Sequence, residues 1–178
     1  MRKNVVTTAE LSSAVRNIPD FPKPGIQFKD ITPILADARL FAGSIDLLIG
    51  DFLPGSIDSV VGIDARGFIF AAAVALKLQA GFVPVRKKGK LPYQTHEESY
   101  ELEYGSNSVA IHTDALKKGS RVLLVDDLLA TGGTAAAAVK LLDKIGVQIV
   151  EVTFVIELGF LKGREKLQGA PVRSLIVY

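Results

Sequence analysis

The stretch that most constrains the fold is residues 121–145, which read RVLLVDDLLATGGTAAAAVKLLDKI. The apolar run Val122–Val125 is typical of a buried strand, and Asp126 and Asp127 follow where that strand would leave its sheet. Apolar residues then recur at helical spacing, which predicts that a helix begins near Gly133 or Thr134. A strand, a glycine loop and a helix N-terminus in succession indicate an anion site, most simply a phosphate site, because backbone N–H groups and the helix dipole converge there.

The acid pair limits the kinds of phosphate compound that this site could bind. A Gly-Gly turn alone more often only connects a strand to a helix. Carboxylates beside a phosphate loop, however, suit a ligand that presents hydroxyl groups or a divalent cation next to its phosphate, as a ribose 5-phosphate does. The sequence contains neither G-x-x-x-x-G-K-[ST] nor a G-x-G-x-x-G after a strand, so it lacks the two better-known nucleotide loops.

The same stretch resembles a known signature. VDDLLATGGT is similar to the phosphoribosyl-pyrophosphate motif of the type I phosphoribosyltransferases, and LLATGGT has the form found in the adenine phosphoribosyltransferases. The resemblance covers residues 18–167 and includes the phrases IPDFPKPGIQFKDITPIL, RKKGKLP, SYELEYG and LKGREKL. It implies one domain over residues 1–178, with a hood of about residues 1–35 and a flexible β-hairpin lid of about residues 91–113.

The order of predicted elements gives the fold class independently. Strands alternate with helices, which predicts an α/β fold with a central, mainly parallel twisted sheet, helices on both faces and ligands at the carboxyl ends of the strands. This is also the fold that the resemblance implies, the type I phosphoribosyltransferase fold.

Composition and charge exclude several classes of protein. The chain has 178 residues and a net charge of only +2, which is too small to indicate a nucleic-acid groove. The absence of cysteine excludes disulfides and thiolate chemistry. Neither an apolar signal segment nor a run long enough to span a membrane is present, so we expect a cytoplasmic protein with no membrane partner.

A second anion site is expected after another strand. The pattern predicts a strand over Ser59–Ile63 and a helix over Gly67–Leu78, separated by Asp64, Ala65 and Arg66. A turn of this kind is more commonly a capping aspartate with an exposed arginine. The resemblance implies instead a pyrophosphate-binding loop at these three residues, with a non-proline cis peptide between the first two.

A cluster of cations follows the next predicted strand, Gly81–Val85. Arg86, Lys87 and Lys90 belong to a run of four cations in five residues, and such a run is usually a solvated face. Because this run ends a strand beside the expected phosphate sites, it also suits a polyphosphate clamp. The resemblance implies that these three residues bind pyrophosphate, some of them across a homodimer interface, and that Mg²⁺ is bound with the pyrophosphate substrate.

The expected lid contains two candidate acids. Residues 99–104 and 108–113 alternate as strands around a Gly-Ser-Asn turn. Glu101 and Glu103 share one face of the first strand, so alternation alone leaves the choice between them open. The resemblance assigns the catalytic acid to Glu103 and the neighbouring lid aromatic to Tyr104.

The proline-rich N-terminal segment is the expected base-binding element. By itself it is a rigid connector, and Phe28 would be an ordinary core aromatic. The resemblance implies that main-chain groups and a stacked ring at Gln27, Phe28 and Lys29 bind adenine, with Leu158 against the base. It further assigns the 5-phosphate to Ala130, Thr131, Gly132, Gly133 and Thr134, and the ribose hydroxyls to Asp126 and Asp127.

The function implied by the resemblance is the conversion of adenine and 5-phosphoribosyl 1-pyrophosphate to AMP and pyrophosphate, a purine salvage reaction. One alternative is a phosphoribosyltransferase for another purine base, against which the hood argues. Another is a non-catalytic sensor of purines or phosphoribosyl pyrophosphate on the same fold. A sensor of the repressor type needs a DNA-binding module, for which the chain has neither the length nor the charge.

Overall fold

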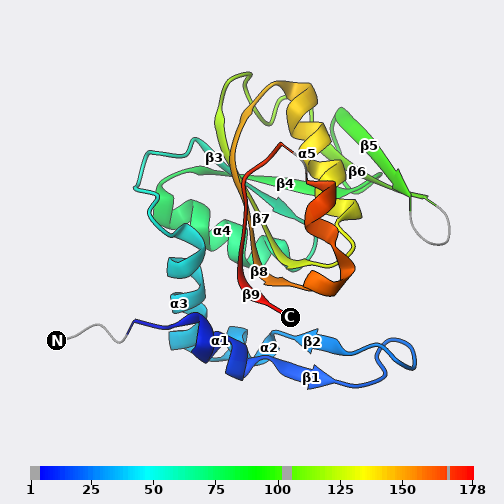
Figure 1. The fold of residues 1–178 in the computed structure, drawn as a ribbon. Helices are drawn as coiled ribbons and strands as arrows, with labels where there is room; N and C mark the ends of the chain where they lie inside the picture. The colour runs from blue at the N-terminus through cyan, green and yellow to red at the C-terminus, as the bar shows by residue number, and fades with distance from the viewer. Residues whose placement is uncertain (1–4, 102–105, 168) are drawn as a thin grey trace. The chain divides into compact units, whose positions relative to one another are not determined.

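The computed structural model describes residues 5–101, 106–167 and 169–178. These residues divide into two compact units, Met1–Gly50 and Asp51–Tyr178, and each unit is described by itself (Figure 1). Glu103 and Tyr104 lie outside the described residues. In the parts of the chain that are described, no helix is long and apolar enough to cross a membrane.

The described part of the smaller unit contains helices and one two-stranded antiparallel sheet. Its elements are α1 (Thr8–Ala14), β1 (Arg16–Ile18), β2 (Phe28–Asp30), α2 (Thr32–Ala36) and α3 (Ala38–Ile49). Side-chain caps set the starts of two helices. Thr7 and Glu10 form a reciprocal capping box on α1, and the Asp37 carboxylate accepts the Arg39 and Leu40 N–H groups at 2.9 Å on α3.

The larger unit is built on a seven-stranded sheet in the order β5-β6-β4-β3-β7-β8-β9. Its strands are β3 (Ser59–Ile63), β4 (Gly81–Lys87), β5 (Thr95–Glu101), β6 (Ser106–His112), β7 (Arg121–Leu129), β8 (Gln148–Glu157) and β9 (Val172–Val177). The strands β4, β3, β7, β8 and β9, named in their order across the sheet, pair in parallel. Strand β6 is antiparallel to both β4 and β5. The expected mainly parallel sheet is therefore confirmed.

Two long helices cover the two faces of this sheet, α4 (Gly67–Leu78) and α5 (Gly133–Ile145), as Figure 1 shows. From β3 the chain passes through α4 to β4 on one side, and from β7 through α5 to β8 on the other. Because parallel crossovers are right-handed, this reversal of strand order places the helices on opposite faces. The carboxyl ends of β3 and β7 thus flank a switch point, where open α/β sheets bind ligands.

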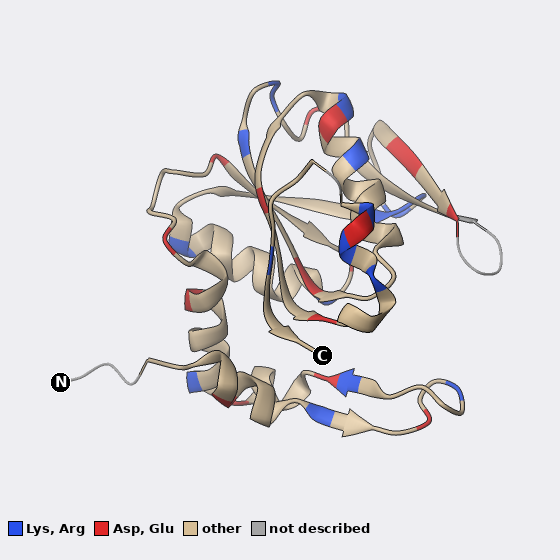
Figure 2. Cartoon of the chain, in the orientation of Figure 1, with Lys and Arg blue, Asp and Glu red and all other residues tan. Residues whose placement is uncertain are grey.

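Burial on both faces explains why the central strands are apolar throughout. Val60 and Val61 of β3 and the run Val122–Val125 of β7 are fully buried. The cartoon in Figure 2 shows charged residues mainly on helices, in loops and near strand ends, with a further group along β5. Two short 3₁₀ turns, η1 (Gly159–Leu161) and η2 (Gly163–Lys166), connect β8 to β9.

The structure differs from the sequence expectations at two element ends. The capping box of Thr7 and Glu10 predicts a helix that runs to about Arg16 or Asn17, but α1 ends at Ala14 because Arg16 begins β1, where it pairs with Asp30. The first strand of the hairpin was expected to begin at residue 99, yet β5 begins at Thr95, and all seven of its residues pair with β6. In both cases pairing with the next strand along the chain overrides the local pattern.

Candidate active site

A cavity of about 290 Å³ lies at the carboxyl ends of β3 and β7. Its wall consists of Ile63 and residues 64–66, which follow β3, and residues 126–135, which lead from β7 into α5. The cavity therefore brings together three features that the sequence analysis singled out: the phosphate loop, the acid pair and the expected pyrophosphate loop of residues 64–66. The cavity is at the switch point of the sheet, as the strand order predicts.

The phosphate loop is a backbone surface at the start of α5. The helix begins at Gly133, as the sequence predicts, and Gly132 precedes it with a φ of 77°, a left-handed conformation that glycine adopts without a steric penalty. No side chain caps this helix at Gly132. The N–H groups of the first turn of a helix have no partner within the helix, so they and the helix dipole present partial positive charge to the cavity.

Gly163 supports this loop from behind. A Cβ atom built on Gly163 would overlap the Ala130 carbonyl oxygen and lie 2.9 Å from the Gly132 nitrogen. A Cβ on Gly132 would likewise lie 2.9 Å from the Gly163 carbonyl carbon. The two backbones touch directly, and this contact requires glycine on both sides.

An ion pair holds Gly163 in this position. Arg164 Nε donates to Glu157 Oε1 at 3.0 Å, and Arg164 Nη1 donates to the Val172 carbonyl at 2.7 Å. Ser174 Oγ donates to Glu157 Oε2 at 2.6 Å, and the hydrogen bond from Arg164 lowers the pKa of the Glu157 carboxyl. These contacts fix η2 to β8 and β9. The LKGREKL phrase was the sequence signal for this support, but it gave no role to Gly163, Arg164 or Glu157.

Asp126 and Asp127 lie within β7, which stays paired with β8 as far as Leu129, so the expectation that the strand leaves its sheet at these acids is wrong. The surroundings of the two acids differ. Asp127 is 6% exposed and its Oδ2 accepts Arg66 Nε at 2.7 Å, while Asp126 Oδ1 accepts the Asp127 N–H at 2.9 Å. Burial and the adjacent Asp127 charge raise the pKa of the Asp126 carboxyl well above its usual value. Burial also raises the pKa of the Asp127 carboxyl, although the Arg66 charge opposes that rise. The two carboxyls are therefore largely shielded from solvent, and this burial disfavours their charged forms.

The turn after β3 supplies a cation to the same cavity. The peptide between Asp64 and Ala65 is cis, as the resemblance implied. Arg66 is at the N-terminus of α4 and reaches Asp127 across the cavity. Close packing of α4 on β7 makes this possible, because a Cβ on Gly67 would lie only 2.5 Å from Asp126 Oδ1.

The expected cation cluster is only partly linked to the cavity. Arg86 Nε donates to Asp64 Oδ2 at 2.9 Å, and Arg86 Nη1 donates to the Lys90 carbonyl at 3.1 Å. Lys87 and Lys90 are exposed at the end of β4. Asp64 lines the cavity and accepts a hydrogen bond from Arg86, so it links the cavity to the cation cluster.

The residues expected to bind the base lie in both units. In the smaller unit Gln27 is exposed, Phe28 packs edge-on against Phe21 with ring centroids 5.1 Å apart, and Lys29 Nζ donates to Asn17 at 2.7 Å. In the larger unit Leu158 follows β8 and is half-buried, and its N–H donates to the Leu129 carbonyl at 2.8 Å.

Comparison with known proteins agrees with this geometry. A family model described as the phosphoribosyl transferase domain matches residues 27–171. The adenine phosphoribosyltransferase of Christiangramia forsetii is 57% identical over 169 residues, covering 95% of this chain and 99% of that protein. The corresponding protein of Acidothermus cellulolyticus is 56% identical, covering 93% and 94%. The chain belongs to the adenine phosphoribosyltransferase family.

Solved structures of the family share the fold. The adenine phosphoribosyltransferase of Rhodothermus marinus superimposes with a TM-score of 0.90 at 49% identity, covering 96% of this chain and 98% of that one. The enzyme of Saccharomyces cerevisiae, solved with an imino-altritol bisphosphate and adenine, superimposes with a TM-score of 0.89 at 45% identity. The match covers 94% of this chain and 97% of that one. The type I phosphoribosyltransferase fold of this chain is therefore shown by relatives as well as by its topology.

The raised pKa of Asp126 leads to a prediction for stability. When a carboxyl binds its proton more tightly in the folded state, the protein loses stability as the pH rises from the unfolded pKa of that carboxyl, 3.8, through its folded pKa. Asp126→Asn should therefore raise the melting temperature at pH 8 by about 2–4 °C, the shift that about 1 kcal/mol produces in a chain of this size. The gain should shrink toward pH 4, as measured by thermal unfolding across pH.

Asp58 provides a matched control at the opposite end of the sheet. Its ion pair with Arg121, 2.7 Å between Oδ1 and Nη2, lowers the pKa of the Asp58 carboxyl to about 2. That pair stabilises the fold above pH 3.8 and is lost as the pH falls toward 2, so Asp58→Asn should lower the melting temperature at pH 8. A gain for Asp126→Asn that is equal at pH 4 and pH 8 would contradict the assignment.

The contact between Gly163 and the loop leads to a second prediction. Gly163→Ala should displace residues 130–132, because the added methyl group meets backbone atoms that cannot rotate away. We expect a loss of about 1–3 kcal/mol in the free energy of unfolding in urea. We also expect at least a tenfold weaker affinity for ribose 5-phosphate by calorimetry, which corresponds to about 1.4 kcal/mol. Gly81→Ala is the control, because its Cβ would meet its nearest neighbour at an ordinary 3.4 Å, and equal behaviour of the two variants would refute the prediction.

Proposed function

We propose that the chain transfers the 5-phosphoribosyl group of 5-phosphoribosyl 1-pyrophosphate to adenine, forming AMP and pyrophosphate in purine salvage. One observation carries the proposal: the acid pair Asp126 and Asp127 shares a cavity with a helix N-terminal loop at the switch point of the sheet. This arrangement occurs in a chain that is 52–57% identical to proteins named adenine phosphoribosyltransferase.

The shape of the cavity supports one order of ligand groups. The 5-phosphate binds the backbone N–H groups of residues 130–134, and the ribose hydroxyls donate to Asp126 and Asp127. The pyrophosphate then extends toward residues 64–66 and the cations Arg86, Lys87 and Lys90. On binding, Arg66 exchanges its contact with Asp127 for pyrophosphate oxygens, which accept from a guanidinium through two parallel hydrogen bonds.

Mg²⁺ is proposed to enter with the pyrophosphate substrate. Among the described residues no group of three or more His, Cys, Asp or Glu side chains is placed to hold a metal ion. The two acids offer carboxylate oxygens, which Mg²⁺ accepts together with substrate oxygens and water, so the site fits a metal held largely by its ligand. When bound, the ion neutralises charge that develops on the departing pyrophosphate.

The proposed reaction breaks the bond between C1 of the ribose and the pyrophosphate oxygen, and forms a bond between C1 and N9 of adenine. The electron pair of the broken bond leaves with pyrophosphate, and cations placed beside that oxygen stabilise the charge where it develops. The proton on N9 passes to Glu103 as the new bond forms. The motif resemblance at SYELEYG supports this role, with Tyr104 beside it.

Adenine selection is proposed for the N-terminal segment. Main-chain groups at Gln27, Phe28 and Lys29 bind the edge of the base, and the Phe28 ring covers its face. The family resemblance also assigns Leu158 to the adenine site. Under this proposal residues 1–35 act as a hood and residues 91–113 as a lid, both serving one catalytic domain over residues 1–178.

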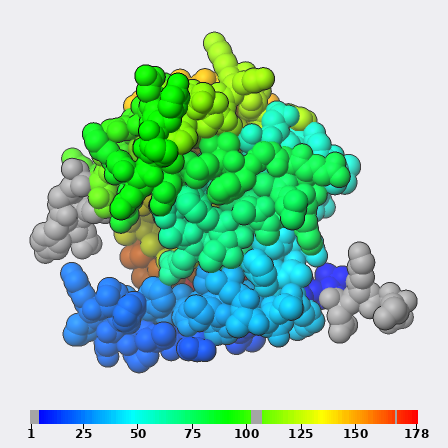
Figure 3. All heavy atoms as spheres, turned by 180° about the vertical axis from the view of Figure 1, so that it is seen from behind, coloured from blue at the N-terminus to red at the C-terminus, as the bar shows by residue number. Residues whose placement is uncertain are grey.

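We also propose that the enzyme is a cytoplasmic homodimer. The support is an apolar surface on α4 and β4 in the larger unit, where Ile69 is 41%, Leu76 81% and Phe82 38% exposed. Ile69 and Leu76 are seven residues apart and so lie on one side of α4, which is at the surface in Figure 3. Burying large apolar side chains against a second copy would stabilise the pair.

The reaction is tested by incubating the protein with 5-phosphoribosyl 1-pyrophosphate, Mg²⁺ and one purine at a time, and measuring pyrophosphate release. Release with adenine, and little or none with hypoxanthine or guanine, is the expected result. Release with another purine in preference to adenine would contradict the base assignment. Binding of the sugar phosphate without release for any base would identify a sensor instead of an enzyme.

The role of Glu103 is tested by substitution with glutamine. Glu103→Gln should lower kcat by about 10²- to 10⁴-fold, the usual contribution of general acid or base catalysis, and leave the affinity for ribose 5-phosphate intact. Glu101→Gln is the matched control, because this acid shares the strand face by alternation and should retain kcat close to that of the parent protein. A large loss of kcat in the Glu101 variant alone would transfer the role to Glu101.

A further inference from the structure

A tyrosine from the hairpin strand β5 reaches the phosphate loop. Tyr100 is half-buried, and its hydroxyl oxygen lies 3.0 Å from Thr134 Oγ1 in the first turn of α5. Its ring packs on Gly133, where an added Cβ would lie 3.1 Å from Tyr100 Cδ2. Tyr100 therefore contacts the loop through its ring and through its hydroxyl group, and neither contact was expected from the sequence.

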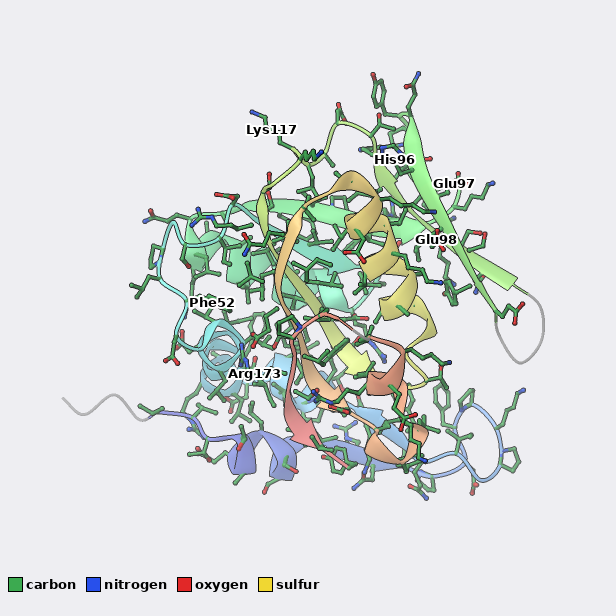
Figure 4. All side chains as sticks on the ribbon, turned by 45° about the horizontal axis from the view of Figure 1, so that its top comes forward. Phe52, His96, Glu97, Glu98, Lys117 and Arg173 are labelled. Atoms are coloured by element: carbon green, nitrogen blue, oxygen red, sulfur yellow. The ribbon has the colours of Figure 1, made fainter. Side chains whose placement is uncertain are left out.

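Neighbouring residues hold the tyrosine in this place. Glu98 is on the same face of β5, because it is two residues before Tyr100, and Figure 4 shows it on the side of the strand toward α5. Its carboxylate forms ion pairs with Lys144 and, at 3.9 Å, with Lys140, both on α5. Every residue of β5 also pairs with β6. The strand is thus docked along α5, and Tyr100 is at the end nearest the loop.

The chemistry of two hydroxyl groups shows what Tyr100 does. A hydroxyl group has one proton to donate and two lone pairs that accept. In the structure Thr134 donates its proton to the Tyr100 oxygen. A phosphate oxygen only accepts, so Thr134 must turn its proton toward a bound phosphate. The Tyr100 hydroxyl is then 3.0 Å from a Thr134 oxygen that has given its proton away, and it can donate in return.

We propose that Tyr100 is a positioning residue for the 5-phosphate. Its hydroxyl group donates to Thr134 Oγ1 when Thr134 donates to the phosphate, forming a chain from tyrosine to threonine to phosphate. Consecutive hydrogen bonds polarise one another, so the donation from Tyr100 strengthens the one that Thr134 makes to the anion. This inference rests on the proposed placement of the 5-phosphate at residues 130–134.

Tyr100→Phe isolates this role, since it removes the hydroxyl group and keeps the ring on Gly133. Two ligands are titrated by calorimetry: ribose 5-phosphate, which carries the 5-phosphate, and Mg²⁺-pyrophosphate, which lacks it. The variant should bind ribose 5-phosphate about three- to tenfold more weakly, the usual effect of losing one hydrogen bond. Its affinity for Mg²⁺-pyrophosphate should be unchanged. If the role of Tyr100 were purely structural, the variant would bind both ligands more weakly. Weaker binding of both ligands, or an unchanged affinity for ribose 5-phosphate, would overturn the proposal.

Two further variants sharpen the test. Tyr93→Phe makes the same chemical change at a tyrosine that is 59% exposed and packs edge-on against His112, and it should leave both affinities unchanged. Thr134→Val removes the middle of the chain, so Tyr100→Phe should cause no further loss of ribose 5-phosphate affinity in that background. An additional loss of the full size would show that Tyr100 acts without Thr134, contrary to the proposal.

The binding measurement also separates this inference from the proposed reaction. If the parent protein binds ribose 5-phosphate and the variants behave as expected, the positioning role stands even when no purine supports pyrophosphate release. If the parent protein releases pyrophosphate with adenine and Tyr100→Phe leaves ribose 5-phosphate binding unchanged, only the positioning role fails. A parent protein that does not bind ribose 5-phosphate would overturn both.

Discussion

The larger unit depends on the reversal of strand order between β3 and β7. Because the two crossovers leave on opposite faces, the chain opens at the carboxyl ends of these strands, and the N-termini of α4 and α5 both point into the opening. Partial positive charge from the first turns of two helices is thereby available at one place before any side chain is considered. The apolar strands on either side, with β7 buried over Val122–Val125, provide the rigid frame that keeps the opening in shape.

Acids placed in such an opening carry a cost that the fold offsets only in part. Burial raises the pKa of both Asp126 and Asp127, which means that the protein around them disfavours their charge. Arg66 offsets this at Asp127 through a contact of 2.7 Å, and the Asp127 N–H offsets it at Asp126. A sugar that donates hydroxyl groups would satisfy the same carboxylates better. Under the proposed function, the two acids would bind the sugar at the expense of the stability of the unliganded protein, a trade-off common to functional sites.

Local patterns were sufficient to predict the parts of the site that are contiguous in sequence. The apolar run of β7, the acids that follow it and the start of α5 at Gly133 each have a local cause in strand periodicity, helix periodicity or glycine conformation. The capping residues Thr7 and Asp37 likewise marked two helix starts correctly, since a cap acts on its own first turn. The fold class, a mainly parallel sheet with helices on both faces, could be inferred because strands alternate with helices along the chain.

The parts that sequence reasoning missed depend on contacts between segments far apart in the chain. Gly163 contacts Gly132, about thirty residues earlier in the chain, and Tyr100 contacts Thr134 from β5, an edge strand of the sheet. Neither contact has a periodicity or a local signature. The end of α1 was misplaced for the same reason, because pairing with β2 decided it. Family resemblance, not physical pattern, decided the choice between Glu101 and Glu103.

A crystal structure with ribose 5-phosphate bound would show directly whether the opening at β3 and β7 is a ribose 5-phosphate site. We expect the phosphate within hydrogen-bonding distance of the backbone N–H groups of residues 131–134, the ribose hydroxyls on Asp126 and Asp127, and Thr134 between the phosphate and Tyr100. A sugar bound with its phosphate at the cations that follow β4, or with its hydroxyls away from the acid pair, would contradict this assignment.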